Sequence, residues 1–115
     1  MSVPPAVAYF SMEIALDPAM PTYAGGLGVL AGDTLRSAAD LQVPMVAVTL
    51  LHRRGYFDQR LDARGHQSEE PVTWPVEDLL EPVEGPVEIE IEGRTVWVRA
   101  WRYSVTGVSG FQVPV

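Results

Sequence analysis

Two apolar segments on either side of a helical pattern constrain the fold of this chain more than any other feature. Residues 7–10 and 45–51 are apolar without alternation, as expected of strands covered on both faces of a parallel sheet. Parallel strands need a long crossover connection, which is usually a helix. The order strand, loop, helix, strand therefore predicts an α/β fold built on a right-handed βαβ unit over residues 6–51.

The helical pattern between these segments has one apolar face. Its apolar positions recur at spacings of three and four: Leu27, Leu30, Ala31, Leu35 and Ala38. The other side carries Asp33 and Arg36, which are spaced to form an ion pair. Pro44 forbids continuation, so we expect the helix to end near Leu41 or Gln42.

A glycine-rich segment, Gly25-Gly26-Leu27-Gly28, immediately precedes this helix. Glycines allow positive φ angles and let a ligand approach the backbone without meeting a Cβ atom. In a βαβ unit the helix begins at the carboxyl edge of the sheet, where open α/β sheets bind ligands, and its unpaired amides favour anions. The spacing matches neither a Walker loop nor a dinucleotide loop. The segment is thus either an anion or sugar-phosphate cradle or simply a tight strand-to-helix connection.

The remainder of the chain divides into two parts. Residues 52–86 are polar and interrupted by prolines, so we expect loops, with one short strand around Tyr56 to Leu61 and with Glu69-Glu70 in a solvated loop. Residues 87–115 should form a β-hairpin followed by a strand at 111–115.

The hairpin prediction rests on strict alternation of apolar and acidic residues. With a two-residue turn at Glu92-Gly93, the aliphatic side chains share one face: Val87, Ile89, Ile91, Val96 and Val98. The other face holds Glu88, Glu90, Trp97, Arg99 and Trp101. Because Glu is unusual in such a turn, a bulged turn is the alternative. Trp97, Trp101 and Tyr103 could stack on sugar rings, but packing against other polypeptide is the expected role.

The composition argues against several classes of function. A net charge of −7 is unfavourable for binding nucleic acid. There is no cysteine, and the two histidines, His52 and His66, lie in polar stretches where solvated loop residues are expected, so we predict no metal site. All eight basic residues are arginines, so a Schiff-base lysine must come from outside this chain. We see no secretory signal and no apolar run that could span a membrane, and we expect a cytoplasmic protein.

An ordered series of segments resembles the start of bacterial α-glucan (glycogen/maltodextrin) phosphorylases. The segments are Ala8-Tyr9-Phe10-Ser11-Met12-Glu13, Pro21 to Asp33, Val48-Thr49-Leu50-Leu51, Gly55-Tyr56-Phe57, Gln59-Arg60, Glu69-Glu70, Trp101-Arg102 and Val113-Pro114-Val115. The resemblance covers essentially the whole chain, which would then be an N-terminal piece of such an enzyme.

The resemblance implies a GT-B fold, in which two Rossmann-like domains face a cleft and this chain forms part of the N-terminal domain. It implies the reaction of α-1,4-glucan with inorganic phosphate to give a shortened glucan and glucose 1-phosphate. It also implies pyridoxal phosphate on a lysine of the C-terminal domain, which this chain lacks. Gly25, Gly26, Leu27 and Gly28 would lie beside the substrate phosphate. Glu13 would be a sugar-facing or supporting group, or else a surface carboxylate or local ion pair, and no catalytic residue is assigned.

We expect the 115 residues to be inactive alone and to self-associate through uncovered apolar strands. No polar tail follows the last strand, which we interpret as a fragment boundary. One alternative is a glycogen or starch synthase, although that family typically has a lysine just before the loop, where Pro21-Thr22-Tyr23 stands here. The other is a non-catalytic carbohydrate-binding or assembly module.

Overall fold

The structure is a computed structural model that describes residues 4–54 and 57–115. Its helices and strands follow in the order β1 (Val7–Phe10), α1 (Gly26–Asp40), β2 (Met45–Val48), β3 (Asp58–Leu61), β4 (Gln67–Glu70), α2 (Val76–Leu79), β5 (Glu81–Pro82), β6 (Val87–Ile91), β7 (Arg94–Val98), β8 (Trp101–Arg102), β9 (Ser104–Thr106) and β10 (Gln112–Pro114). The predicted α/β fold, with a βαβ unit followed by a hairpin, is confirmed at this level.

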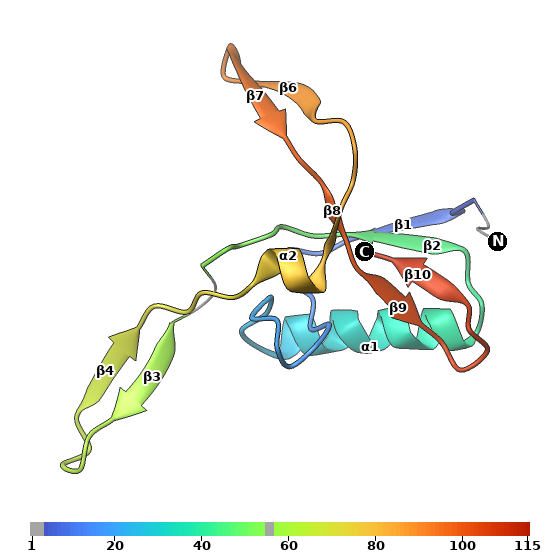
Figure 1. Ribbon diagram of the computed structural model, residues 1–115. Coiled ribbons are helices and arrows are strands. Elements are labelled where there is room, and N and C mark those ends of the chain that lie inside the picture. Colours follow the sequence, from blue (N-terminus) through green and yellow to red (C-terminus); the bar gives the residue numbers. More distant parts are fainter. Residues whose placement is uncertain (1–3, 55–56) are drawn as a thin grey trace.

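β1 and β2 pair in parallel, with Val7 opposite Met45 and Phe10 opposite Val48. The antiparallel pair β9–β10 lies beside β2, and α1 runs along one face of the layer that these four strands form (Figure 1). The expectation that the first two strands are covered on both faces is wrong for the described chain. α1 covers one face, while on the other Phe10 is 74% and Val48 is 44% exposed.

α1 ends where Pro44 predicts, with Leu41 as its C-cap. Gln42 has a φ of 57°, and the amides of Gln42 and Val43 donate to the carbonyls of Ala39 and Ala38. This is the pattern of a Schellman motif, which satisfies the last carbonyls of a helix. The expected ion pair between Asp33 and Arg36 is present, at 3.6 Å.

The buried face of α1 is rotated from the predicted one. Leu27 and Leu30 are 49% and 63% exposed, so placing them in the core was wrong. The buried positions are Gly28, Ala31, Gly32, Leu35, Ala38 and Ala39. The rotation follows from the two glycines, because residues 13–22 pack directly on the helix backbone there. A Cβ at Gly32 would overlap the carbonyl of Ala15.

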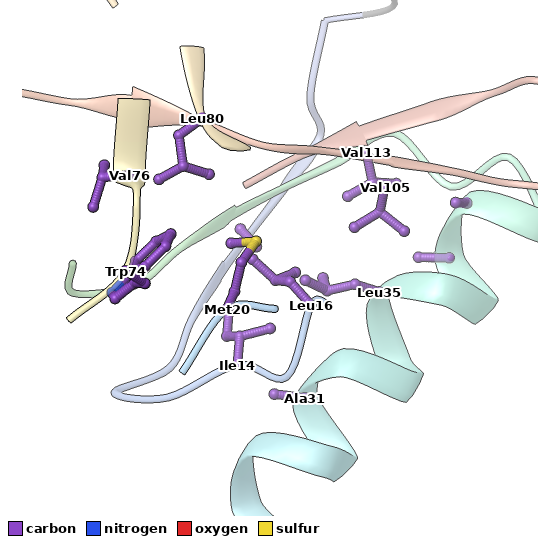
Figure 2. Close-up of a cluster of buried hydrophobic side chains, with 13 residues drawn as sticks. Ile14, Leu16, Met20, Ala31, Leu35, Trp74, Val76, Leu80, Val105 and Val113 are labelled. Atoms are coloured by element: carbon purple, nitrogen blue, oxygen red, sulfur yellow. The ribbon is translucent and has the colours of Figure 1, made fainter. Parts of the chain in front are cut away.

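The core lies between α1, this packed loop and the strands β2, β9 and β10. Figure 2 shows Ile14, Leu16 and Met20 from the loop meeting Leu35 from the helix. Val105 and Val113 close one end of the cluster, and Trp74, Val76 and Leu80 extend it under the segment around α2. The loop is therefore a structural layer of the unit rather than a flexible connection.

The segment 52–86 contains more structure than the predicted single strand. β3 and β4 form an antiparallel hairpin, and α2 and β5 follow. Its turn is built on Asp62, whose carboxylate accepts the amides of His66 and Arg64, and these bonds hold the pKa of Asp62 below its ordinary value. Glu70 is exposed as expected but lies in a strand and pairs with Arg60 at 3.3 Å. Gly55 and Tyr56 lie outside the described residues.

The hairpin of β6 and β7 has the predicted register, with Val87 opposite Val98 and Ile91 opposite Arg94. Glu92 and Gly93 have φ angles of 50° and 74°, as a two-residue type I′ turn requires, so no bulge is needed. The placement of Trp101 on this hairpin was wrong. β7 ends at Val98, and Trp101 pairs with Pro82 in the short ladder of β5 and β8.

The uncovered apolar side chains should make this 115-residue chain self-associate. Phe10, Val48 and Leu50 are exposed on or beside the open face of β1 and β2. We expect sedimentation velocity to show a weight-average mass that rises with concentration, and the double variant Phe10→Ser/Val48→Thr to reduce the rise. Leu61→Ser, on the separate β3–β4 hairpin, is the matched control and should change little. A monomer at every concentration would contradict this expectation.

Candidate functional site

The carboxyl ends of β1 and β2 border a shallow hollow of about 260 Å³. Its walls are largely apolar: Phe10, Ser11, Met12, Val48, Thr49 and Leu50. The hydroxyl of Thr49 is buried there without a hydrogen-bond partner in the described part of the chain. Because no charged side chain lines the hollow, it offers little chemistry by itself. The better candidate is the glycine segment, which begins α1 at this same end of the strands (Figure 1).

Glu13 fastens the glycine segment to the end of the first strand. Its Oε2 accepts a hydrogen bond from the amide of Ala24 at 2.7 Å, and its Oε1 accepts one from the amide of Gly28 at 3.2 Å. The residue is only 9% exposed, so the alternative of a surface carboxylate is wrong. A negative charge at the start of a helix is also stabilised by the helix dipole. The observed role of Glu13 is therefore to hold the loop.

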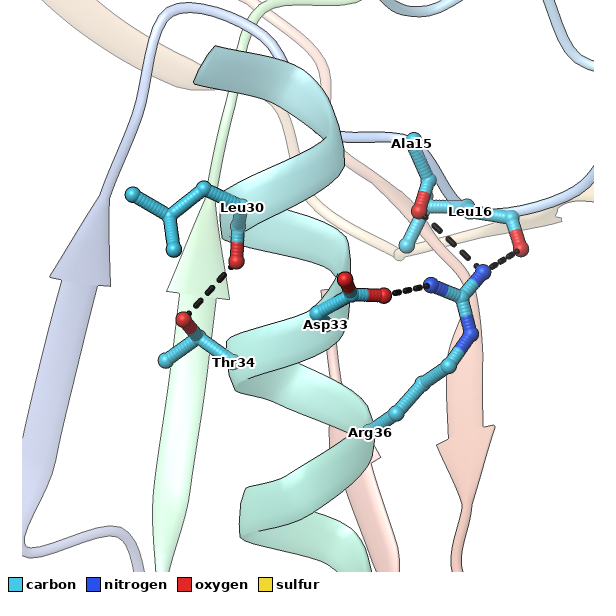
Figure 3. A network of polar contacts seen from close by, with 6 residues as sticks. All are labelled: Ala15, Leu16, Leu30, Asp33, Thr34 and Arg36. Carbon is cyan, nitrogen blue, oxygen red and sulfur yellow. Dashed lines mark hydrogen bonds and ion pairs between the residues drawn. The ribbon is translucent and has the colours of Figure 1, made fainter. Parts of the chain in front are cut away.

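Arg36 holds the same loop further along α1. Figure 3 shows its guanidinium reaching the carbonyls of Ala15 and Leu16, with N···O distances of 3.3 and 2.7 Å, and pairing with Asp33. The amide of Ala15 in turn donates to the carbonyl of Gly28. The loop is thus attached to the helix at both its first and third turns, which limits how far the glycine segment can move.

The conformations of the glycines correct one sequence inference. None of Gly25, Gly26 and Gly28 has a positive φ, so the backbone angles do not require glycine at these positions. At Gly28 packing requires it, because a Cβ would overlap the Cβ of Tyr23 and lie 3.4 Å from the carboxyl carbon of Glu13. At Gly25 and Gly26 a Cβ would meet nothing within 4 Å. The backbone there faces open space.

The amides of the segment divide into two groups. Those of Ala24 and Gly28 are taken by Glu13, so the expectation of a fully unpaired set was wrong. Within residues 4–54 and 57–115, no acceptor is found for the amides of Gly25, Gly26 and Leu27. These three exposed amides stand at the positive end of the helix dipole, where anions are favoured. Their binding to a substrate phosphate stays a prediction.

The comparisons with known proteins agree with the resemblance seen in the sequence. No family model matches the chain. It is 39% identical over 106 residues to the maltodextrin phosphorylase of Thermococcus litoralis, a match that covers 86% of this chain. It is 44% identical over 95 residues to the glycogen phosphorylase of Mycobacterium tuberculosis, covering 78% of this chain. This chain is a relative of the glycogen and maltodextrin phosphorylases.

The relationship is confined to a small part of those proteins. The chain spans 13% of the length of the Thermococcus phosphorylase and 11% of the length of the Mycobacterium phosphorylase. Most of the polypeptide of these phosphorylases therefore lies outside the part that resembles this chain. The part described here contains the glycine segment with the side chains that hold it, Glu13 and Arg36.

Two further observations concern metal ions and membranes. Among the described residues, no three acidic or histidine side chains gather in a way that could hold a metal ion. His66 instead pairs with Asp62 at 3.3 Å in the β3–β4 turn. No helix in the described ranges is long and apolar enough to cross a membrane.

The two kinds of glycine in the segment predict opposite effects of adding a methyl group. Gly28→Ala should lower the free energy of unfolding by about 1–3 kcal/mol, because the methyl overlaps Tyr23 and presses on Glu13. Gly26→Ala is the matched control: it meets open space in the first turn of α1 and should leave stability unchanged or raise it by up to about 1 kcal/mol. Urea unfolding of both variants measures the difference, and equal destabilisation would contradict the geometry.

Proposed function

We propose that this chain supplies the glycine loop, Gly25 to Gly28, to the substrate cleft of an α-1,4-glucan phosphorylase. The reaction would transfer the terminal glucosyl unit of an α-1,4-glucan, such as glycogen or maltodextrin, to inorganic phosphate and release glucose 1-phosphate. The observation that carries the proposal is the set of three exposed, unpaired amides at Gly25, Gly26 and Leu27. The kinship with phosphorylases gives the substrate class.

Three properties of the loop suit it to binding a phosphate: its amide hydrogen-bond donors, the helix dipole and a backbone that a ligand can reach. The three amides lie in the first turn of α1 or just before it, so the helix dipole adds to their attraction for an anion. The missing side chains at Gly25 and Gly26 let an oxygen approach the backbone itself. Donors held in advance stabilise charge that develops during transfer, since they need no reorganisation at that moment. Glu13 and Arg36 hold the loop, and with it these amide donors, in a fixed position.

Pyridoxal phosphate, which the resemblance implies, does not fit the side chains present here. A Schiff base needs an amine, and the 115 residues contain no lysine. The cofactor would therefore be held by other polypeptide of the enzyme. We assign no step through it to this chain.

The proposal places the opposite wall of the cleft on a second Rossmann-like domain, as in the GT-B arrangement. The loop described here would then form one side of a site that closes only in the longer enzyme. On this account the 115 residues alone do not catalyse phosphorolysis.

A single methyl group in the glycine loop tests this proposal in a full-length phosphorylase that carries residues 1–115. Gly26→Ala should reduce kcat/KM for phosphorolysis of maltodextrin by at least about tenfold, because the methyl enters the space where the phosphate oxygen approaches. Ser37→Ala, an exposed change on the same helix, is the matched control and should retain activity. Glucose 1-phosphate release is the measurement.

Three results would count against the proposal. Gly26→Ala could leave phosphorolysis unchanged while the control behaves as expected. The isolated 115-residue chain could release glucose 1-phosphate by itself. The full-length protein could extend a glucan from a sugar nucleotide and ignore phosphate, which would point to a synthase instead.

A further inference from the structure

Hairpin β6–β7 carries an exposed aromatic surface that the glycine loop does not use. Its register places Glu88 opposite Trp97 and Glu90 opposite Thr95, and we call these four side chains the Trp97 face. All four residues are exposed, with Trp97 at 62%. Figure 1 shows the hairpin projecting from the rest of the chain, on the side of the strand layer away from α1.

Trp97 differs from the other two tryptophans in its surroundings. Trp74 is 9% exposed and donates its indole N–H to the carbonyl of His52 at 2.8 Å. Trp101 is half-buried, packs on the core, and lies under the guanidinium of Arg53, 5.5 Å from the ring centre. Packing is therefore the observed role of Trp101 and of Tyr103. Trp97 makes no such contact within the described chain, where its indole has no hydrogen-bond or ring partner among residues 4–54 and 57–115.

The hairpin geometry brings carboxylates beside this indole. A two-residue turn makes Ile91 and Arg94 a hydrogen-bonded pair, so Glu88 and Trp97, three rungs further along, form a non-hydrogen-bonded pair. The Cα atoms of such a pair are about 4.5 Å apart, and its side chains are correspondingly close. Glu90 is the diagonal neighbour, within reach of a large ring. In the described chain the carboxylates of Glu88 and Glu90 form no ion pair.

The opposite face of the hairpin indicates which side remains in solvent. Val87, Ile89 and Ile91 lie there with Val98, and they are 39% to 59% exposed. A two-stranded hairpin is marginally stable alone, so an aliphatic face of this kind is the one that protein would cover. Covering it leaves the Trp97 face pointing outward. An unpaired indole beside two free carboxylates is then available to a ligand.

The chemistry of the Trp97 face selects a neutral ligand rich in hydroxyl groups. Its two carboxylates outnumber Arg99, the basic residue that the alternation assigns to this side, and this charge is unfavourable for phosphates and nucleic acids. A pyranose ring presents a face of C–H groups that packs on an indole, while the hydroxyls at its edge donate to carboxylates and to the Thr95 hydroxyl. The face therefore matches a sugar chain better than an anion or a purely apolar ligand.

We infer that the Trp97 face is a surface binding site for α-1,4-glucan, separate from the glycine loop, with Trp97 as the stacking platform and Glu88 and Glu90 as acceptors. The identity of the glucan rests on the proposed function. A polymer bound at this site is kept near the enzyme, which raises the effective concentration of its chain ends at the cleft.

Titration of maltoheptaose into the 115-residue chain, followed by NMR of the tryptophan indole N–H signals and by calorimetry, tests the inference. We expect saturable binding that shifts the Trp97 signal and leaves the Trp74 signal unchanged. Trp97→Thr should weaken binding at least about tenfold, whereas Trp97→Phe should retain most of it, because a smaller aromatic ring still stacks. Glu88→Gln should weaken binding several-fold. Glu69→Gln, an exposed acid on the β3–β4 hairpin, is the matched control.

The backbone signals of β6 and β7 in Trp97→Thr and Trp97→Phe show whether the hairpin keeps its register. No binding by the wild-type chain overturns the inference. So does wild-type affinity in Trp97→Thr, or a shift confined to signals of α1. Binding to the 115-residue chain and phosphorolysis by the full-length enzyme are separate measurements. Binding without phosphorolysis leaves this inference standing, and phosphorolysis without binding refutes it while leaving the proposed function intact.

Discussion

The carboxylate of Glu13 bonded to the amides of Ala24 and Gly28 is the interaction on which the rest of this structure depends. It joins the segment after the first strand to the start of α1, and it acts beside the bonds of Arg36 to the carbonyls of Ala15 and Leu16. The bond to Gly28 is possible because Gly28 has no Cβ, so that Tyr23 and Glu13 can pack against the helix backbone. Removing the carboxylate would leave the amide of Ala24 without its acceptor, and would leave the amide of Gly28 with the carbonyl of Gly25 alone, at 3.1 Å.

This clamp also determines what the glycine segment can offer a ligand. By occupying the flanking amides, Glu13 leaves those of Gly25, Gly26 and Leu27 exposed in a fixed direction. The segment has no basic side chain, so its attraction for an anion comes from backbone donors and the helix dipole alone. In the proposed function such a cradle would position a phosphate, but it would supply no proton and no amine. In the proposed enzyme those functions belong to polypeptide outside these residues.

Local pattern was enough to predict some elements and could not predict others. The end of α1 at Leu41 follows from Pro44, and the β6–β7 register follows from alternation around Glu92-Gly93, because both depend on neighbours in sequence. The bonds of Glu13 span 11 and 15 residues, and no spacing rule indicates them. The ladder of β5 and β8 was likewise missed, since two-residue strands have no recognisable pattern. The exposure of Leu27 and Leu30 depends on where the loop packs, which only the three-dimensional structure shows.

Amide hydrogen exchange at Ala24 and Gly25 tests the central claim most directly. The two amides are adjacent in one exposed loop, but only that of Ala24 is bonded to Glu13, at 2.7 Å. The account predicts clear protection of the Ala24 amide and rapid exchange at Gly25, with the protection at Ala24 lost in Glu13→Ala while the core amide of Val105 stays protected. Equal, rapid exchange at Ala24 and Gly25 in the wild-type chain would contradict it.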